Sequence, residues 1–283
     1  MKLIHHWLPI ASGPKTADTL QQPKLTAVLR GYHHMARAER TALVTGSGQM
    51  IGKGIALRLA EAGFNIILNG SKNKTICEET SAEVEAYGVD TLIAMGNVGI
   101  KEEAEGIAKA GIDEFGGIDV LVNNAAIRPH AGFLEISEEE WQQVQDVNLN
   151  ATIWLCRACL PGMVEKKWGR IINFTGMNAQ RGYHGAAAVS VSKHGNWGLT
   201  KSLSDEFGQF GITTNIISPG TFPGDDYDLS KDEHRSKLRD ENPMRRLGLT
   251  TEIGGMIAYL CSKDGSFVNG QMLQINGGVV VQF

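Results

Sequence analysis

Short runs of aliphatic residues alternate with longer amphipathic segments through most of the 283-residue chain. The short runs are apolar without a two-residue alternation, as expected for parallel strands that helices cover on both faces. Such a sheet places the carboxyl ends of its strands at one edge, where ligands bind. The sequence therefore predicts a doubly wound α/β fold with a seven-stranded parallel sheet.

The predicted elements follow one another in strand–helix order, with no internal repeat. The predicted strands are Ala42–Val44, Asn65–Leu68, Thr91–Met95, Val120–Val122, Ile171–Phe174, Thr213–Ile217 and Met272–Ile275. The predicted helices are Gly52–Ala62, Thr75–Tyr87, Lys101–Phe115, Glu138–Lys166, Ala187–Gln209 and Thr251–Cys261. The beginning of the chain has no sustained period, so we expect an N-terminal extension at residues 1–35 and a single domain at 36–283.

The composition argues against several classes of protein. The net charge of −4 provides no strong positive field to attract nucleic acid. No apolar run approaches the roughly 18 residues that a membrane span requires. The four cysteines are scattered, which fits a reducing cytoplasm. Two of them, Cys156 and Cys159, form a C-x-x-C pattern in an apolar helical segment, where we expect packing and not metal binding.

A glycine-rich turn joins the first predicted strand to the first predicted helix. It reads Thr45-Gly-Ser-Gly-Gln-Met-Ile-Gly52. Glycines allow the backbone to approach a pyrophosphate, and the helix N-terminus stabilises its negative charge. Glycines also serve ordinary tight turns, but this position in an α/β chain favours nucleotide binding and a Rossmann-type fold.

This turn and several later motifs resemble those of the short-chain dehydrogenase/reductase family. The family's turn reads T-G-x-x-x-G-x-G, and here Thr45, Gly46 and Gly52 match while Met50 replaces the middle glycine. Further similar motifs are Asn97-Val98, Asn123-Asn124-Ala125-Ala126, Val147-Asn148-Leu149, Pro219-Gly220 and Asn276-Gly277-Gly278. The resemblance runs from about Thr41 to Gly278. It implies hydride transfer between a nicotinamide cofactor and a small carbonyl or alcohol substrate.

The resemblance also implies which residues contact the cofactor. They are Gly46, Ser47, Gln49, Ile51, Gly52, Asn97, Val98, Asn124, Ala125, Lys193, Pro219 and Gly220. Members that use NAD carry an acidic residue at the end of the second strand. Here Gly70 stands at that position, so no carboxylate repels a 2′-phosphate, and Ser71 and Lys72 could bind it. We predict NADP, with NAD possible; the alternative is that Lys72 is a solvated loop residue.

The proton donor of the family is absent. The family uses a tyrosine as the donor, a lysine four residues later, and a serine thirteen residues before the tyrosine. Lys193 matches the lysine and Asn148 the family's helix asparagine, but Val189 and Gly176 occupy the tyrosine and serine positions. Valine cannot donate a proton and glycine has no side chain, so the resemblance implies an altered active site.

Other residues near the same edge could supply the missing chemistry. The hydroxyl of Thr175 could polarise an oxygen, and Tyr183 or His184 could donate a proton, although each could equally be an ordinary loop residue. Basic residues in the neighbouring loops suggest an anionic small-molecule substrate, unless they are simply solvated: Arg128, His130 and Arg181.

Residues 221–247 lie where the family has a substrate lid, and we expect a mobile flap there. The resemblance further implies a homotetramer or homodimer formed through the helical segments 138–166 and 187–209. Three functions remain open at this point. They are an NADP-dependent oxidoreductase with a non-standard proton donor, a non-redox lyase or isomerase, and a non-catalytic cofactor-binding partner or sensor.

Overall fold

Seven parallel strands form one sheet in the computed structural model, which describes residues 38–224 and 232–281. The strands are β1 (Thr41–Val44), β2 (Asn65–Leu68), β3 (Thr91–Ile93), β4 (Val120–Val122), β5 (Gly169–Phe174), β6 (Ile212–Pro219) and β7 (Met272–Ile275). Their order is β3-β2-β1-β4-β5-β6-β7, and every neighbouring pair is parallel. The order reverses between β1 and β4, so a crevice is expected there at the carboxyl edge. The predicted fold class is confirmed.

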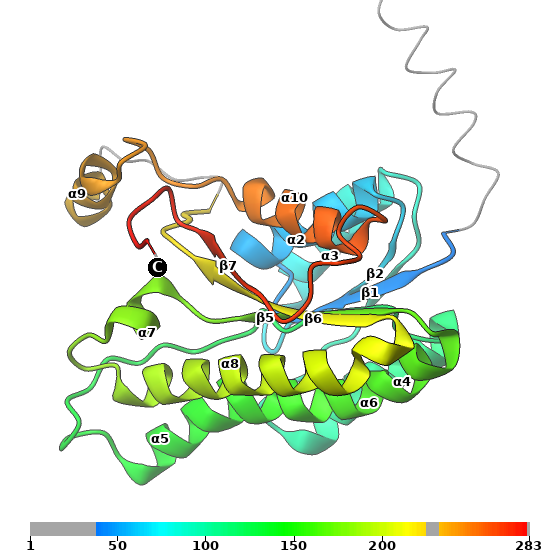
Figure 1. Cartoon of the computed structure of the whole chain (residues 1–283), viewed down its shortest axis with the longest axis horizontal. Coiled ribbons are helices and arrows are strands. Elements are labelled where there is room, and N and C mark those ends of the chain that lie inside the picture. The colour runs from blue at the N-terminus through cyan, green and yellow to red at the C-terminus, as the bar shows by residue number, and fades with distance from the viewer. Residues whose placement is uncertain (1–37, 225–231, 282–283) are drawn as a thin grey trace, which may run out of the picture. The chain divides into compact units, whose positions relative to one another are not determined.

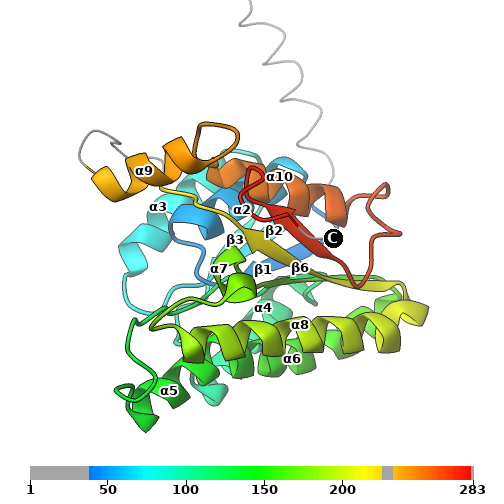
Figure 2. The ribbon, with the colours of Figure 1, turned by 60° about the vertical axis from the view of Figure 1, so that its left-hand side comes forward.

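Helices cover both faces of the sheet (Figures 1 and 2). One face is covered by α2 (Met50–Glu61), α3 (Lys74–Glu85) and α10 (Thr250–Cys261). The other is covered by α4 (Lys101–Phe115), α6 (Ala151–Lys166) and α8 (Ala187–Phe207). Along β1, Ala42 and Val44 pack into the first core and Leu43 into the second, all fully buried. This double burial explains why the strands read as unbroken apolar runs.

The helix predicted at 138–166 is divided into three parts. A π-helical turn at Asp146–Asn150 separates α5 (Glu138–Gln145) from α6. The amide of Asn148 in this turn bonds the backbone of Ile127, accepting from its nitrogen at 2.9 Å and donating to its oxygen at 3.0 Å. Single π turns are frequent at functional sites. This one fixes the loop after β4 against the second helical layer.

Two segments differ from the sequence-based expectation. The segment between β5 and α8, which holds Tyr183 and His184 and was expected to be a loop, contains the short helix α7 (Met177–Arg181). The expected flap contains α9 (Glu233–Glu241), none of whose residues is buried. The mobility of the flap stays a prediction. The expected extension at 1–35 lies outside the described residues.

Two observations concern functions that the sequence argued against, which are metal binding at the C-x-x-C pattern and insertion into a membrane. Cys156 and Cys159 are each 2% exposed in the core beneath α6, as the packing interpretation predicts. Burial raises the pKa of the Cys156 thiol to about 12. Within residues 38–224 and 232–281, no helix combines the length and apolar character needed to cross a bilayer.

Candidate functional site

A cavity of about 460 Å³ opens at the carboxyl edge of the sheet, beside β1 and β4. Its volume lies in the usual range for small-molecule sites, roughly 300–1,000 Å³. Ten of the residues predicted to bind a cofactor line it: Gly46, Gln49, Ile51, Gly52, Ser71, Lys72, Asn97, Val98, Asn124 and Ala125. The topology therefore brings together residues that lie up to 79 positions apart in the chain.

The glycine-rich turn forms one wall of this cavity. Gly46 has φ +62°, a left-handed conformation that favours glycine, and a Cβ on Gly52 would collide with the carbonyl oxygen of Gly46. Met50 adopts φ +52°, which costs a non-glycine residue roughly 1–2 kcal/mol. No side chain caps α2 at Gln49, so the first backbone N–H groups of the helix can receive an anion.

Two polar side chains hold the turn against the loop that follows β4. The amide of Asn124 donates to the backbone oxygens of Thr45 and Gly46, at 2.9 Å and 3.1 Å. The buried hydroxyl of Thr45 accepts from the backbone nitrogens of Asn124 and Ala125, both at 3.0 Å. Asn124 and Ala125 therefore position the turn as well as line the cavity.

The end of β2 forms the opposite wall. Asn69, 2% exposed, accepts from the nitrogen of Gly46 and donates to the carbonyl oxygens of Ala94 and Gly96. The backbone nitrogen of Asn69 donates to Ser47 Oγ at 2.9 Å. Ser47 is fully buried and does not line the cavity, so its hydroxyl supports this wall from within the protein.

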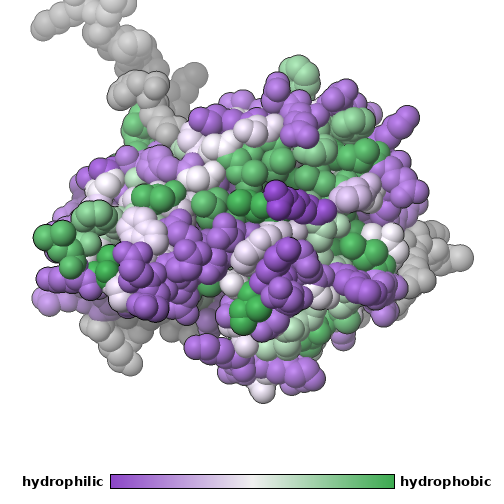
Figure 3. Space-filling model, turned by 90° about the horizontal axis from the view of Figure 1, so that it is seen from below, coloured by the Kyte–Doolittle hydropathy of each residue, from purple (hydrophilic) through white to green (hydrophobic). Residues whose placement is uncertain are grey.

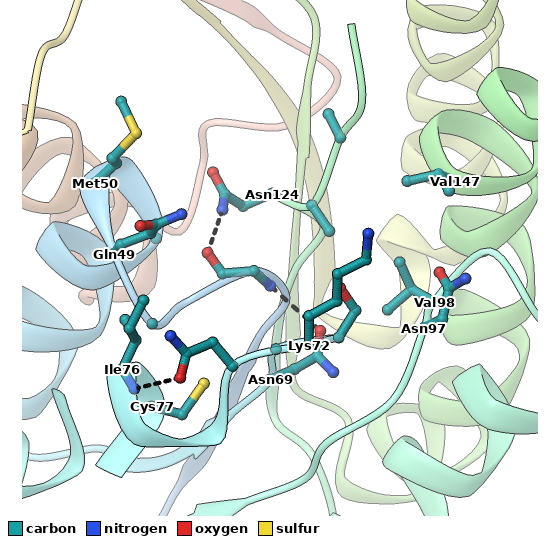
Figure 4. A pocket seen from close by; sticks show the side chains of 18 of the residues that line it. Gln49, Met50, Asn69, Lys72, Ile76, Cys77, Asn97, Val98, Asn124 and Val147 are labelled. Atoms are coloured by element: carbon teal, nitrogen blue, oxygen red, sulfur yellow. Dashed lines mark hydrogen bonds between the residues drawn. The ribbon is translucent and has the colours of Figure 1, made fainter. Parts of the chain in front are cut away.

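The position expected to carry an acid in NAD-dependent relatives has no room for a side chain. A Cβ on Gly70 would lie 2.7 Å from Cys77 Sγ, so the thiol of α3 fills that space. Ser71 and Lys72 follow and are exposed, and Lys72 extends across the cavity (Figure 4). No aspartate or glutamate is among the described residues that line the cavity. These features suit a ligand with phosphate groups.

Lys193 lies on α8 and is not among the residues that line this cavity, although its charge interacts with that of Arg128, which does line it. Its side chain is 3% exposed, and no hydrogen bond or ion pair joins its Nζ to any described residue. Burial and the positive charge of Arg128, which lines the cavity, lower the pKa of Lys193 to about 7. One helical turn earlier, Val189 is 5% exposed and packs in an apolar cluster with Val144 and Ala186.

Other predicted residues stand at the carboxyl ends of neighbouring strands. Thr175 follows β5 and donates its backbone nitrogen to Ile217 on β6. Pro219 ends β6, and Gly220 comes so close to Asn276 that a Cβ would lie 2.8 Å from its Cα. These residues lie at the same edge of the sheet as the cavity but do not line it.

Tyr183 and His184 come together with a third ring at the same edge. The ring of His130 lies 6.4 Å from that of Tyr183 and 5.9 Å from that of His184, measured between centroids. Desolvation lowers the pKa of Arg128, and the nearby Tyr183 phenol opposes this shift. Tyr183, His184 and Arg181 are all exposed to solvent. Tyr183 and His184 thus lie beside His130, at the surface.

Sequence reasoning missed several residues of the cavity. Asn69 directly follows a correctly predicted strand, so its place at the strand end was a usable signal. Ile76 and Cys77 reach the cavity from α3, and Val147 from the π turn. Only the packing of these helices on the sheet places them there, so the sequence offered no local signal.

Comparisons with known proteins agree with this fold. The family model described as Enoyl-(Acyl carrier protein) reductase matches residues 46–280. The 3-oxoacyl-(acyl-carrier-protein) reductase FabG of Staphylococcus aureus strain Mu50 is 35% identical over 240 residues, covering 85% of this chain and 98% of the relative. The Vibrio cholerae protein of that name is 37% identical over 242 residues, covering 85% and 97%. The crystal structure of acetoin dehydrogenase YohF from Salmonella typhimurium gives a TM-score of 0.78 at 31% identity, covering 86% of this chain and 98% of that one.

Proposed function

Because the chain belongs to the short-chain dehydrogenase/reductase family, we propose that it is an NADP-dependent oxidoreductase acting on a small carbonyl compound or the corresponding alcohol. The observation that carries this proposal is the cavity that runs from the glycine-rich turn to Arg128, whose charge acts on the buried Lys193. Two curated relatives named as reductases, whose lengths this chain covers to 98% and 97%, also support it.

The cofactor is held mainly by the turn and by the ends of β2 and β3. The N–H groups at the start of α2 bind the diphosphate, and Lys72 with Ser71 binds the 2′-phosphate. Asn97 and Val98, which line the cavity, would contact the adenine, as the family resemblance implies. When bound, the cofactor supplies or accepts a hydride at the substrate carbon. Residues of the chain must then exchange a proton with the substrate oxygen.

Lys193 provides this proton in place of the tyrosine that Val189 replaces. Its ammonium is buried and unpaired among the described residues, and its lowered pKa of about 7 allows it to give up a proton near neutrality. During reduction the proton passes from Nζ to the substrate oxygen, and solvent reprotonates the amine. Tyr183 and His184 are exposed and are the alternative donors.

The substrate carries a negative group. Arg128 and Lys193 lie close enough to repel one another, and neither is paired with a carboxylate in the described residues. A carboxylate or phosphate on the substrate would relieve this repulsion and could accept two hydrogen bonds from the guanidinium.

The test is a calorimetric titration with NADPH and NADH, followed by a panel of carbonyl compounds with and without a carboxylate. We expect tighter NADPH binding and NADPH consumption with anionic carbonyls. Lys193→Met should abolish turnover, whereas Tyr183→Phe and His184→Ala should retain it. If either of those two variants is inactive and Lys193→Met is active, the donor assignment is wrong.

The losses at Val189 and Gly176 favour one of two alternatives if the redox assay fails. Substrate turnover with no change in the cofactor's redox state would indicate a non-redox lyase or isomerase. Tight NADPH binding without turnover of any substrate would indicate a cofactor-binding partner or sensor. No binding of either nucleotide would overturn the proposal.

We also infer that copies of the chain associate into a homodimer or homotetramer. Figure 3 shows the side of the domain that lies lowest in Figure 1, where α5, α6 and α8 run, and hydrophobic side chains gather across its middle. Val191 on α8 is 51% exposed. The family resemblance places association on these helices, and light scattering tests the oligomeric state.

A further inference from the structure

A second cavity, of about 740 Å³, lies at the amino edge of the sheet, opposite the one just described. It is lined by Arg40, which precedes β1, and by the segments that follow α6, α8 and α10. The ends of these elements lie at the right of Figure 1. The proposed oxidoreductase chemistry makes no use of this edge. Its volume is again that of a small-molecule site.

The lining of this cavity is strongly cationic. Arg40, Lys167, Arg170 and Lys263 line it, and no aspartate or glutamate does so among the described residues. None of the four forms an ion pair with a described residue. Four unpaired cations around one cavity are unusual in a chain whose net charge is −4. Their mutual repulsion decreases when an anion binds between them.

An indole holds two of these cations in place. The guanidinium carbons of Arg40 and Arg170 lie 3.9 Å and 4.4 Å from the centroid of the Trp168 ring. Burial and the charge of Arg40 both act to lower the pKa of Arg170. Cation–π contact offsets part of the repulsion and fixes both side chains before any ligand arrives.

Arg170 also has a structural role that the other three cations lack. It is 3% exposed, and its Nε donates to the carbonyl oxygen of Leu260 at the end of α10. Its Nη1 donates to the oxygens of Gly169 and Gly211, which leaves Nη2 without a hydrogen bond to a described residue. Beside it, the buried Thr213 hydroxyl has no hydrogen-bond partner among those residues. Buried polar groups rarely remain unpaired in the absence of a ligand or water.

The charge of the segment that precedes Arg40 argues against its acting as the ligand of this cavity. Residues 1–37 contain five lysines and arginines and one aspartate, so their charge has the same sign as the cavity. From the unpaired cations, the preorganised guanidinium pair and the unpaired hydroxyl, we propose that this cavity binds a small molecule bearing two or more phosphate charges, at a site separate from the cofactor cavity. Guanidinium groups match phosphate oxygens in geometry as well as charge.

The experiment is isothermal titration of the full chain with pyrophosphate. Arg40 and Lys263 are exposed, and apart from the stacking of Arg40 on Trp168 neither side chain has a hydrogen bond or ion pair with a described residue, so the double variant Arg40→Gln/Lys263→Gln should fold normally. Lys72→Gln serves as the matched control, because it removes one cation from the cofactor cavity instead. We expect pyrophosphate to bind the wild type and the control alike, and the double variant at least about tenfold more weakly.

Three results would overturn the proposal. They are equal binding to the wild type and the double variant, loss of binding in Lys72→Gln alone, or no binding to the wild type at millimolar pyrophosphate. The second result would place pyrophosphate in the cofactor cavity. Because the readout is pyrophosphate affinity and not turnover, failure of the oxidoreductase assay leaves this test intact.

Discussion

Gly176→Ser, which places a serine where the family resemblance implies one, should increase the rate of the proposed carbonyl reduction. Gly176 follows β5 with φ −172°, an extended conformation that any residue adopts, and an added Cβ would meet no atom within 4 Å. Gly176 is also the N-cap of α7, where serine is slightly better than glycine. The new hydroxyl can accept from a helix N–H and still donate its proton to a substrate oxygen.

The magnitudes follow from these two roles. Replacing a glycine in a compatible conformation stabilises a protein by about 0.4–1 kcal/mol, because the unfolded chain loses freedom. For a domain of this size that raises Tm by roughly 1–4 °C. Removing one hydrogen bond to a reacting oxygen costs other enzymes about 10²–10³ in kcat. Since the new group is not optimised, we expect Gly176→Ser to gain about tenfold in kcat.

The assay is NADPH consumption with the best anionic carbonyl, alongside thermal unfolding. Gly106→Ser is the matched control, because Gly106 is exposed on α4 and its added Cβ also meets nothing within 4 Å. Both variants should gain stability, and only Gly176→Ser should gain activity. If Gly176→Ser folds, binds NADPH as the wild type does and yet shows no increase in kcat, the substrate oxygen does not lie beside this position. The alternative Val189→Tyr is a poorer test, because overpacking its apolar cluster costs about 1–3 kcal/mol.

Four further predictions concern the cofactor site and the proposed donor. Lys72→Ala should weaken NADPH binding about tenfold with little change for NADH, since only NADPH carries the 2′-phosphate; Lys74→Ala, in an exposed ion pair, should affect neither in the same titrations. Carbonyl reduction should slow as pH rises through about 7, because Lys193 then loses the proton it donates. Lys193→Met should raise the free energy of unfolding most at pH 5–6, where burying the ammonium is costly, and less at higher pH, where the native amine becomes neutral. Denaturant titrations at several pH values measure this difference, and a stabilisation independent of pH would contradict the reasoning. Asn124→Ala should cost roughly 1–3 kcal/mol of stability and weaken NADPH binding, because two backbone oxygens lose their donor; unchanged denaturation and affinity would contradict this.

The fold was predictable because both faces of the sheet are buried. β2, β4 and β7 begin and end at the predicted residues. The π turn was not predictable, because its residues suit an ordinary helix and the residue that Asn148 bonds, Ile127, is distant in sequence.

The candidate site was predictable where local motifs define it. The turn from Gly46 to Gly52 lies at the cavity, as its position after a strand indicates. The burial of Lys193 depends on how α8 packs, and the closeness of Cys77 to Gly70 depends on how α3 packs. No short sequence motif predicts either arrangement. The cationic cavity at the amino edge joins four segments that are distant in sequence, so the charges of Arg40 and Lys263 carried no signal on their own.

The proposed hydride transfer, with Val189 at the position that the resemblance assigns to the family's tyrosine, is tested most directly by isotope transfer. The protein would be incubated with NADPH deuterated at the transferring position and the panel of anionic carbonyl compounds, and the products analysed by mass spectrometry. We predict deuterium on the carbinol carbon of an alcohol product for the wild type and none for Lys193→Met. Absence of deuterated product from a protein that binds NADPH tightly would contradict the oxidoreductase assignment.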